Sequence, residues 1–132
     1  MKYLLDTHVF IWFIEGSDAL PQEMREEITL IKNECYLSIA SIWEIAIKCS
    51  IGKLELKSDF HEITDFLSDN NIKILPVEFH HLQTLLNLEF IHRDPFDRLI
   101  ISQGVADRLT VMTADKQFES YESAGFLLFG KP

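Results

Sequence analysis

The stretch Tyr3-Leu4-Leu5-Asp6 decides how this chain is expected to fold, because three apolar residues are followed directly by a carboxylate. A short apolar run that ends at a polar residue is typical of a strand buried inside a sheet. The run Leu109–Met112 repeats the pattern near the other end of the chain, and Asp115 follows it after Thr113 and Ala114. Both runs therefore predict buried strands with an acid close to their carboxyl ends.

Strand-like and helix-like segments alternate along the rest of the chain. Three further strands are expected at Cys35–Ile39, Ile72–Val77 and Phe126–Phe129. Helices are expected, from apolar spacing and from proline and glycine positions, at Val9–Ile14, Pro21–Asn33, Ser41–Ile51, Phe60–Leu67, Glu78–Leu88 and Asp94–Asp107. Such alternation favours an α/β fold with a central parallel sheet of about five strands flanked by helices. The order of the strands is left open.

Composition limits the class of protein. With 132 residues, 47% hydrophobic and 25% charged, the chain suits one globular domain over residues 1–132. Its net charge of −9 lacks the basic excess typical of nucleic-acid-binding proteins. No apolar run approaches the roughly 20 residues of a membrane span, and no signal peptide is visible. Two cysteines without a CxxC pair suit a reducing compartment, so we expect a cytoplasmic protein without membrane contact.

Four acids fall where strands end or helices begin. Asp6 and Asp115 follow two of the strands, and Glu44 lies one turn into the helix after the strand Cys35–Ile39. Asp97 lies in the first turn of the helix that begins near Asp94. Ligands of open α/β sheets bind beyond the carboxyl ends of the strands. If the strands concerned are neighbours, three of the acids share one sheet edge, and Asp97 can join them from its helix.

Carboxylates crowded in this way repel one another, and their pKa values rise unless a cation binds. Oxygen ligands without sulfur or imidazole suit Mg²⁺ or Mn²⁺. Such an ion activates a water for attack on a phosphodiester and stabilises charge on the leaving oxygen. The pattern therefore indicates a shared metal site. Whether one or two ions bind is left open.

Each acid alone also has a structural interpretation. Ser41 and Glu44 have the S-x-x-E spacing of a capping box, in which the glutamate bonds a backbone N–H. Asp6 can cap the first helix, Asp115 can cap a turn, and the helix dipole favours Asp97 in a first turn. Only the placement of all the acids at one end of one sheet separates the metal-site hypothesis from these interpretations.

Four blocks of the sequence resemble, in the same order, PIN-domain proteins of the VapC toxin type. The blocks are Leu4–Trp12, Ser38–Lys48 with Gly52–Leu54, His92–Ile101 and Thr113–Phe118. The resemblance covers essentially the whole chain and implies a PIN fold and an Mg²⁺- or Mn²⁺-dependent endoribonuclease. It implies that the acids that bind metal and catalyse hydrolysis are Asp6, Glu44, Asp97 and Asp115. Asp94 is a rival of Asp97, but the residues after Asp97 match the family's helix, so Asp94 is assigned a capping role.

The resemblance also implies supporting residues and partners. Thr7 and Thr113 match hydroxyl positions beside the first and fourth acids, and with Ser41 they are expected to hydrogen-bond the ligands. The HRDPFDR block resembles the subgroup often paired with Phd/YefM-type antitoxins. The implied protein is a homodimeric toxin of a type II toxin–antitoxin pair, inhibited by its antitoxin. Substrates in this family are structured RNAs, often tRNA.

Several other side chains remain open to two interpretations. The candidates for RNA contact are His8, Lys48, Arg93 and Arg98, although the arginines can instead pair with nearby acids. His92, like His8, is a candidate base or phosphate contact. Trp12 and Trp43 lie on apolar helix faces and are expected in the core rather than as platforms for RNA bases.

The main alternative is a signalling domain of the receiver type, or a non-catalytic module, with an acidic Mg²⁺ pocket. A receiver needs two adjacent acids after its first strand and a phosphoacceptor aspartate after its third. Here Asp6 stands alone after the first strand, and Ile72–Val77 contains no aspartate. The sequence therefore favours the nuclease.

Overall fold

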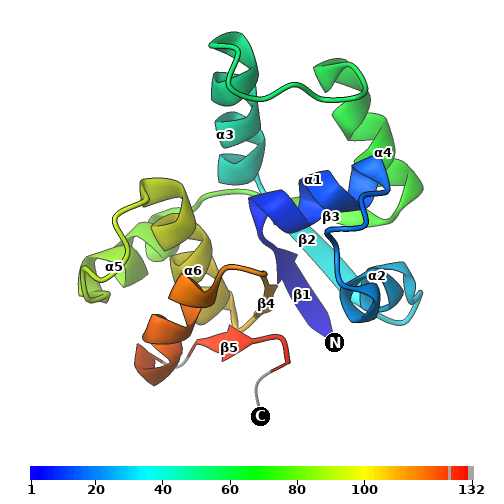
Figure 1. Ribbon diagram of the computed structural model, residues 1–132. Helices are drawn as coiled ribbons and strands as arrows, with labels where there is room; N and C mark the ends of the chain where they lie inside the picture. Colours follow the sequence, from blue (N-terminus) through cyan, green and yellow to red (C-terminus); the bar gives the residue numbers. More distant parts are fainter. Residues whose placement is uncertain (125, 131–132) are drawn as a thin grey trace.

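The computed structural model of the chain describes residues 1–124 and 126–130. Within these residues, a five-stranded sheet has the order β3-β2-β1-β4-β5, with every neighbouring pair parallel (Figure 1). The strands are β1 (Lys2–Leu5), β2 (Glu34–Ser38), β3 (Ile72–Leu75), β4 (Thr110–Met112) and β5 (Leu127–Leu128). The expected α/β fold with a parallel sheet is confirmed, and the strand order that the sequence left open places β1 at the centre.

This strand order contradicts the receiver-like alternative. A receiver has the flavodoxin-like order, in which the first strand lies between the second and the third. Here β1 lies between β2 and β4, and β3 is an edge strand. Three residues along β1 show why it takes the centre: Tyr3 and Leu5 belong to the apolar core on one face of the sheet, and Leu4 belongs to the core on the other. A strand buried on both faces needs the continuous apolar run seen in the sequence.

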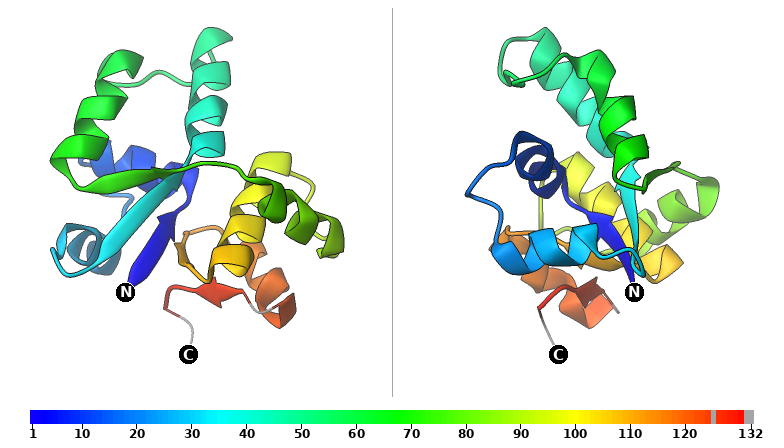
Figure 2. Two further views of the ribbon diagram at one scale, coloured as in Figure 1. Left: turned by 180° about the vertical axis from the view of Figure 1, so that it is seen from behind. Right: turned by 90° about the vertical axis from the view of Figure 1, so that its right-hand side faces the viewer.

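Helices cover both faces of the sheet. They are α1 (Thr7–Glu15), α2 (Gln22–Thr29), α3 (Ile39–Ser50), α4 (Ile63–Asp69), α5 (Phe79–Asn87) and α6 (Pro95–Asp107), with short 3-10 helices at Phe60–Glu62 and Lys116–Ala124. Residues from α1 to α4 contribute to one core and residues of α6 to the other. Figure 2 shows the helices from behind and from the side, with α5 packed along α6. In the described part of the chain, no helix combines the length and apolar character that crossing a membrane requires.

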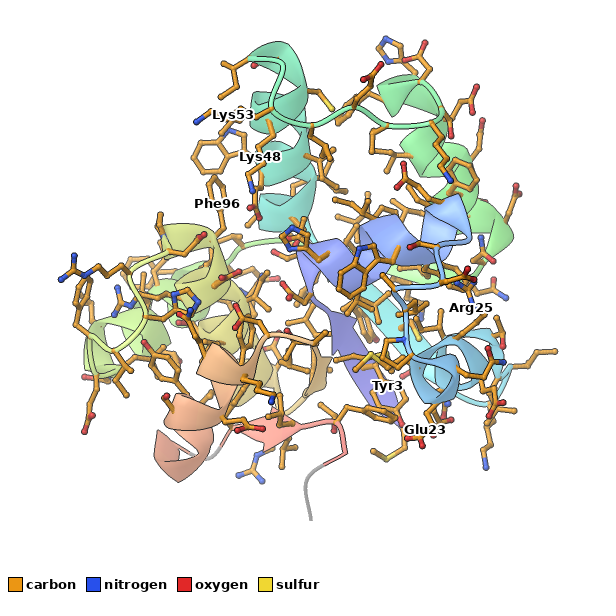
Figure 3. All side chains as sticks on the ribbon, in the orientation of Figure 1. Tyr3, Glu23, Arg25, Lys48, Lys53 and Phe96 are labelled. Carbon is orange, nitrogen blue, oxygen red and sulfur yellow. The ribbon has the colours of Figure 1, made fainter. Side chains whose placement is uncertain are left out.

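The carboxyl ends of the three inner strands meet at one edge of the sheet. Leu5 at the end of β1 pairs with Leu37 of β2 on one side and with Met112 of β4 on the other. The residues that follow these strands therefore lie at the same edge, as the metal-site hypothesis requires. In Figure 3, Lys48 on α3 marks this end of the molecule, and Tyr3 near the start of β1 lies toward the opposite end.

Two helix boundaries differ from the expectations. The expected strand residue Ile39 begins α3, because the Ser38 hydroxyl accepts the backbone N–H of Ala40 and caps the helix. Ser41 is therefore inside the helix, and the capping box proposed for Ser41 and Glu44 is wrong. Helix α2 ends at Thr29 rather than near residue 33, because the backbone of Leu30 is extended.

Candidate metal centre

Asp6 connects β1 to α1 at the sheet edge. Its backbone N–H donates to the carbonyl of Met112 at 2.9 Å, which joins the ends of β1 and β4. Its Oδ1 accepts the backbone N–H of Thr7 at 2.8 Å, and its Oδ2 accepts the hydroxyl of Thr113 at 2.8 Å. Asp6 is thus the N-cap of α1, as the structural interpretation expected. The same hydrogen bonds hold its buried carboxylate in a fixed orientation at the carboxyl end of the sheet.

Glu44 reaches the same edge from the second turn of α3. The hydroxyl oxygen of Thr7 lies 3.1 Å from Glu44 Oε1 and 2.9 Å from the hydroxyl of Ser41. Lys48, one turn further along α3, donates to Glu44 Oε2 at 2.8 Å. Glu44 is buried, so this lysine compensates a charge that has little access to water. The hydroxyls of Thr7 and Ser41 therefore contact one another and an acid, as expected of supporting residues.

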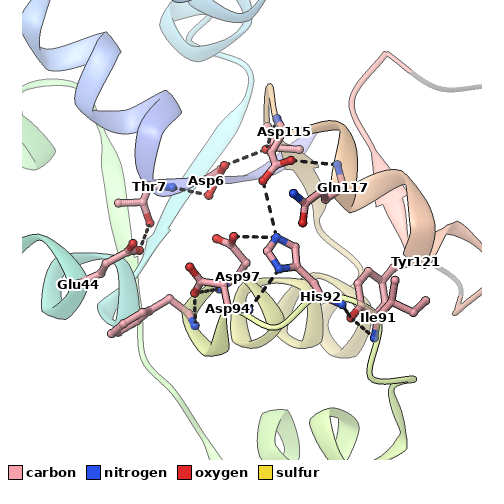
Figure 4. A network of polar contacts seen from close by, with 12 residues as sticks. Asp6, Thr7, Glu44, Ile91, His92, Asp94, Asp97, Asp115, Gln117 and Tyr121 are labelled. Atoms are coloured by element: carbon pink, nitrogen blue, oxygen red, sulfur yellow. Dashed lines mark hydrogen bonds and ion pairs between the residues drawn. The ribbon is translucent and has the colours of Figure 1, made fainter.

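Asp97 is aimed at the site by the start of α6. Asp94 is the N-cap, and its Oδ1 accepts the backbone N–H groups of Phe96 at 2.8 Å and of Asp97 at 3.2 Å. Pro95 follows at the first helical position, where its missing N–H costs nothing. The expected capping role of Asp94 is confirmed. The cap fixes the first turn of the helix and places Asp97 opposite Asp6 (Figure 4).

His92 joins this group, although the four-acid set did not include it. Its Nε2 lies 3.1 Å from Asp97 Oδ2 and 3.7 Å from Asp115 Oδ2, and its Nδ1 accepts the backbone N–H of Asp94 at 3.2 Å. A neutral imidazole that accepts at Nδ1 carries its proton on Nε2. His92 therefore faces the acids as a proton-bearing group rather than as a ligand with a free lone pair. The Tyr121 hydroxyl accepts the backbone N–H of His92 and fixes the loop.

Asp115 approaches from the loop after β4. Its backbone N–H donates to the Thr113 hydroxyl at 3.0 Å, and its Oδ1 accepts the backbone N–H of Gln117 at 2.9 Å. The expected turn-capping role is therefore present here too. Thr113 joins the first and fourth acids, because the same hydroxyl that accepts from Asp115 donates to Asp6. The second oxygen of Asp115 is the one that faces His92.

The electrostatics of this group show the conflict that the sequence implied. Burial, followed by the neighbouring charges of Asp6, Asp94, Glu44 and Asp115, raises the pKa of Asp97 to about 8. Burial also raises the pKa of Asp6, against the hydrogen bonds from Thr113 and Thr7 that lower it. The pKa of Lys48 is raised, and the largest cause is its hydrogen bond to Glu44. The acids are thus crowded enough to favour either protons or a cation.

The residues proposed to contact RNA lie at different distances from the acids. His8 is exposed and Lys48 is partly exposed, and with Lys53 and Glu44 they line a small cavity of about 100 Å³. Arg93 is exposed, whereas the guanidinium of Arg98 lies 4.8 Å from the centre of the Phe90 ring. Lys48 and His8 are therefore the members of the set that border the acids directly.

One tryptophan prediction is wrong. Trp12 is partly buried and packs against the core. Trp43 is 61% exposed, because α3 turns Glu44 and Ile45 inward and the residue before them outward. The sequence pattern missed this because α3 is rich in apolar residues, so its inward and outward faces are hard to tell apart from the sequence. For His92, the available signal was its place two residues before a helix cap, which the other histidines lack.

Comparisons with known proteins agree with this architecture. The model of the PIN domain family matches residues 3–123. Similar solved structures are VapBC2 from Rickettsia felis bound to a promoter DNA fragment (TM-score 0.71, 18% identity, 97% of each chain covered) and VapBC-1 from nontypeable Haemophilus influenzae (0.70, 16%, 97% and 96%). A third is a toxin–antitoxin complex from Klebsiella pneumoniae (0.56, 16%, 88% and 89%). No curated protein sequence matches the chain. The family model covers most of the sequence, and the chain therefore belongs to the PIN domain family.

Proposed function

We propose that this chain, as a single PIN domain over residues 1–132, is an endoribonuclease that depends on Mg²⁺ or Mn²⁺. The observation that carries the proposal is the convergence of Asp6, Glu44, Asp97 and Asp115 from separate segments on one edge of the sheet. Burial and the charges of the neighbouring acids raise the pKa of Asp97 to about 8. Capping alone does not explain why acids that repel one another are held side by side.

The donor set fits a hard divalent ion. Ligand atoms of Asp97 and Asp115 lie within 4.8 Å of one another and of His92, which is close enough for a shared ion. The proton on His92 Nε2 leaves the carboxylate oxygens as ligands, and oxygen ligands select Mg²⁺ or Mn²⁺ over softer metals. The buried Nε2 has no aligned hydrogen-bond partner among the described residues. A cation that fixed the carboxylates would complete this arrangement.

The residues of the chain divide the work as follows. Asp6, Asp97 and Asp115 would hold the ion, and Glu44 would add a carboxylate whose charge is shared with Lys48. A bound divalent ion would supply Lewis-acid chemistry for activating a water and for stabilising charge on the leaving oxygen. The hydroxyl groups keep the carboxylates in place: Thr113 holds Asp6, and Thr7 with Ser41 holds Glu44. Asp94 shares in the site through its charge and through the helix start that it caps.

The test is cleavage of total RNA by the purified chain with Mg²⁺ or Mn²⁺, with EDTA, and by Asp6→Asn. We expect cleavage that requires the metal and that Asp6→Asn abolishes. The matched control is Asp65→Asn, which makes the same charge change at an exposed position on α4. Cleavage that persists in EDTA, or that survives Asp6→Asn, would show that the proposed centre is not the nuclease site.

We further propose that the chain is a toxin of the VapC type in a type II toxin–antitoxin pair. The support is the likeness in fold to VapBC complexes and to a complex named as toxin–antitoxin. A Phd/YefM-type antitoxin, a homodimer, a structured RNA such as tRNA as substrate, and action in the cytoplasm belong to the same proposal. Expression of the chain should arrest growth, Asp6→Asn should not, and a small protein encoded beside it should relieve the arrest. Growth arrest by Asp6→Asn would contradict this role.

A further inference from the structure

An exposed aromatic pair borders the acids. The rings of Trp43 and Phe96 meet edge to face, with centroids 5.3 Å apart and planes at 72°. Trp43 directly precedes Glu44 on α3, and Phe96 directly precedes Asp97 on α6. Helices α3 and α6 pack against each other, so the pair joins them just outside the acids. Phe96 is partly buried and supports Trp43, which remains 61% exposed.

Positive groups lie on the same side of the molecule as the aromatic pair. Lys48 and Lys53 line the small cavity beside Glu44, and Figure 3 shows both lysines on the side of α3 where Phe96 lies. Lys53 is exposed in the turn that follows α3. Although the chain carries a net charge of −9, this border of the acids combines flat rings with ammonium groups. Proteins that bind single-stranded nucleic acid use this combination, with rings for the bases and cations for the phosphates.

We propose that Trp43, supported by Phe96, stacks an unpaired base of the RNA substrate next to the bond that is cut. Lys48 and Lys53 then hold the adjoining phosphate. This inference rests on the proposed nuclease function and adds that the substrate is single-stranded or looped out at the site. A base inside a duplex has both faces covered by its neighbours and cannot stack on Trp43. Lys53 favours a phosphate over a basic protein segment at this border, because it is exposed and has no ion pair among the described residues, whereas Lys48 already pairs with Glu44.

The indole itself can report on the contact. Trp12→Phe leaves Trp43 as the single tryptophan, and Asp6→Asn in the same chain prevents cleavage during the measurement. The probe is a single-stranded RNA of about 12 nucleotides, a length within the site sizes of single-strand binders. It is compared with the same RNA in a duplex. We expect saturable quenching of Trp43 fluorescence by the single strand and none by the duplex. Equal quenching by both, or none by either, would overturn the inference.

Substitutions separate stacking from a general loss of structure. Trp43→Leu should weaken binding of the single strand about tenfold, in the range of one lost base–aromatic stack, and Trp43→Phe should retain most of it. Phe79→Leu is the matched control, because it removes a ring that is 76% exposed on α5, a helix that carries none of the four acids. Unchanged RNA binding by Trp43→Leu would overturn the inference. So would a loss restricted to binding of a protein partner.

Cleavage by the chain with Trp43 intact tests the nuclease function separately. Metal-dependent cleavage without quenching of Trp43 would support the nuclease function and contradict the stacking role of Trp43. Quenching without metal-dependent cleavage would contradict the nuclease function. In the active chain, Trp43→Leu should raise KM for single-stranded RNA about tenfold and leave kcat nearly unchanged. A fall in kcat alone would mean that Trp43 does not bind the substrate through stacking.

Discussion

Two clusters of histidine and aspartate in this protein differ in charge balance. One consists of His92, Asp97 and Asp115, and the other consists of His80, His81 and Asp107. In each cluster the ligand atoms lie within 4.8 Å of one another. Burial alone would raise the pKa of Asp107, but hydrogen bonds from His80 and His81 outweigh it and lower the pKa. For Asp97, burial and neighbouring acids act together and raise the pKa to about 8. Proximity of ligand atoms is therefore insufficient to identify a metal site, and the uncompensated charge distinguishes the cluster that we propose to bind a cation.

The balanced cluster is a clamp between two helices. His81 is fully buried, its Nδ1 accepts the backbone N–H of Glu78 at 2.9 Å, and its Nε2 lies 2.8 Å from Asp107 Oδ2. The proton is therefore on Nε2 and is donated to Asp107. His80 contacts the other oxygen of Asp107 at 2.8 Å. Both oxygens have partners, and the cluster joins the start of α5 to the end of α6.

The largest expected effect separates the two aspartates by activity. Asp97→Asn should lower the cleavage rate by roughly 10³-fold, because several kcal/mol of charge stabilisation by the ion is lost with its ligand. Asp107→Asn, the matched change in the balanced cluster, should alter the rate less than about threefold. Cleavage rates measured on one RNA with Mn²⁺ test this prediction. Equal losses of cleavage rate in the two variants would contradict the proposed difference between the clusters.

The next effect concerns stability and pH. In EDTA, the folded protein holds a proton on Asp97 up to about pH 8, whereas the unfolded chain releases it near the ordinary value of 3.8. The contribution of Asp97 to the free energy of unfolding is therefore complete below pH 3.8 and is lost as the pH rises from there through 8. At about 1.4 kcal/mol per pKa unit, we expect a loss of roughly 3 kcal/mol between pH 5 and pH 8.

Urea unfolding at each pH measures this loss. Asp97→Asn should reduce the slope of the profile and leave the part that the raised pKa of Asp6 contributes. Mn²⁺ should restore stability to the unsubstituted protein at pH 8. Asp107, with its lowered pKa, stays ionised throughout this range and adds no slope. A flat profile of the unsubstituted protein in EDTA would show that the acids are not in conflict.

His81→Leu should lower the free energy of unfolding by about 2 kcal/mol, because it leaves the backbone N–H of Glu78 and one oxygen of Asp107 without partners. His80→Leu is the control, because His80 is half exposed and its contact is worth about 1 kcal/mol or less. Calorimetry with and without Mn²⁺ measures both. If either substitution weakened Mn²⁺ binding, the balanced cluster would have to be counted as a metal site.

The smallest expected effect concerns His92. His92→Phe should weaken Mn²⁺ binding about tenfold, since it removes a proton-bearing group that orients the ligands Asp97 and Asp115. His92→Gln keeps an N–H donor and should retain most of the affinity. Electron paramagnetic resonance of bound Mn²⁺ gives a second readout, because an imidazole ligand produces nitrogen coupling. If nitrogen coupling appeared and were lost in His92→Gln, His92 would be a metal ligand. Its Nε2 would then not carry the proton that distinguishes it from the carboxylate oxygens of the acids.

The parts of the site that the sequence predicted are those set by local pattern and strand direction. Asp6 and Asp115 could be placed because apolar runs just before them mark the ends of strands, and parallel strands bring such ends to one edge. Asp97 could be placed because Asp94 and Pro95 mark the start of a helix. The strand order was not predictable, because alternation of elements says that strands are parallel but not which ones are neighbours.

Other parts escaped because they depend on direction rather than on type. The inward and outward faces of α3 differ by small rotations, and Trp43 was placed on the wrong one. His92 became part of the site through a loop conformation that the Tyr121 hydroxyl fixes from far along the chain. The start of α3 was misplaced because Ser38 and Ser41 have the same chemistry as helix caps, and only the backbone hydrogen bond from Ala40 decides between them.

The hydrogen bond from Thr113 to Asp6 spans 107 positions of sequence. Because synthesis proceeds from the N-terminus, Asp6 is made more than 100 residues before its supporting hydroxyl on Thr113 and before Asp115. A nascent or prematurely terminated polypeptide therefore lacks the assembled centre. If the proposed nuclease activity holds, this order of assembly delays hydrolysis of RNA until the ribosome has passed Thr113 and Asp115.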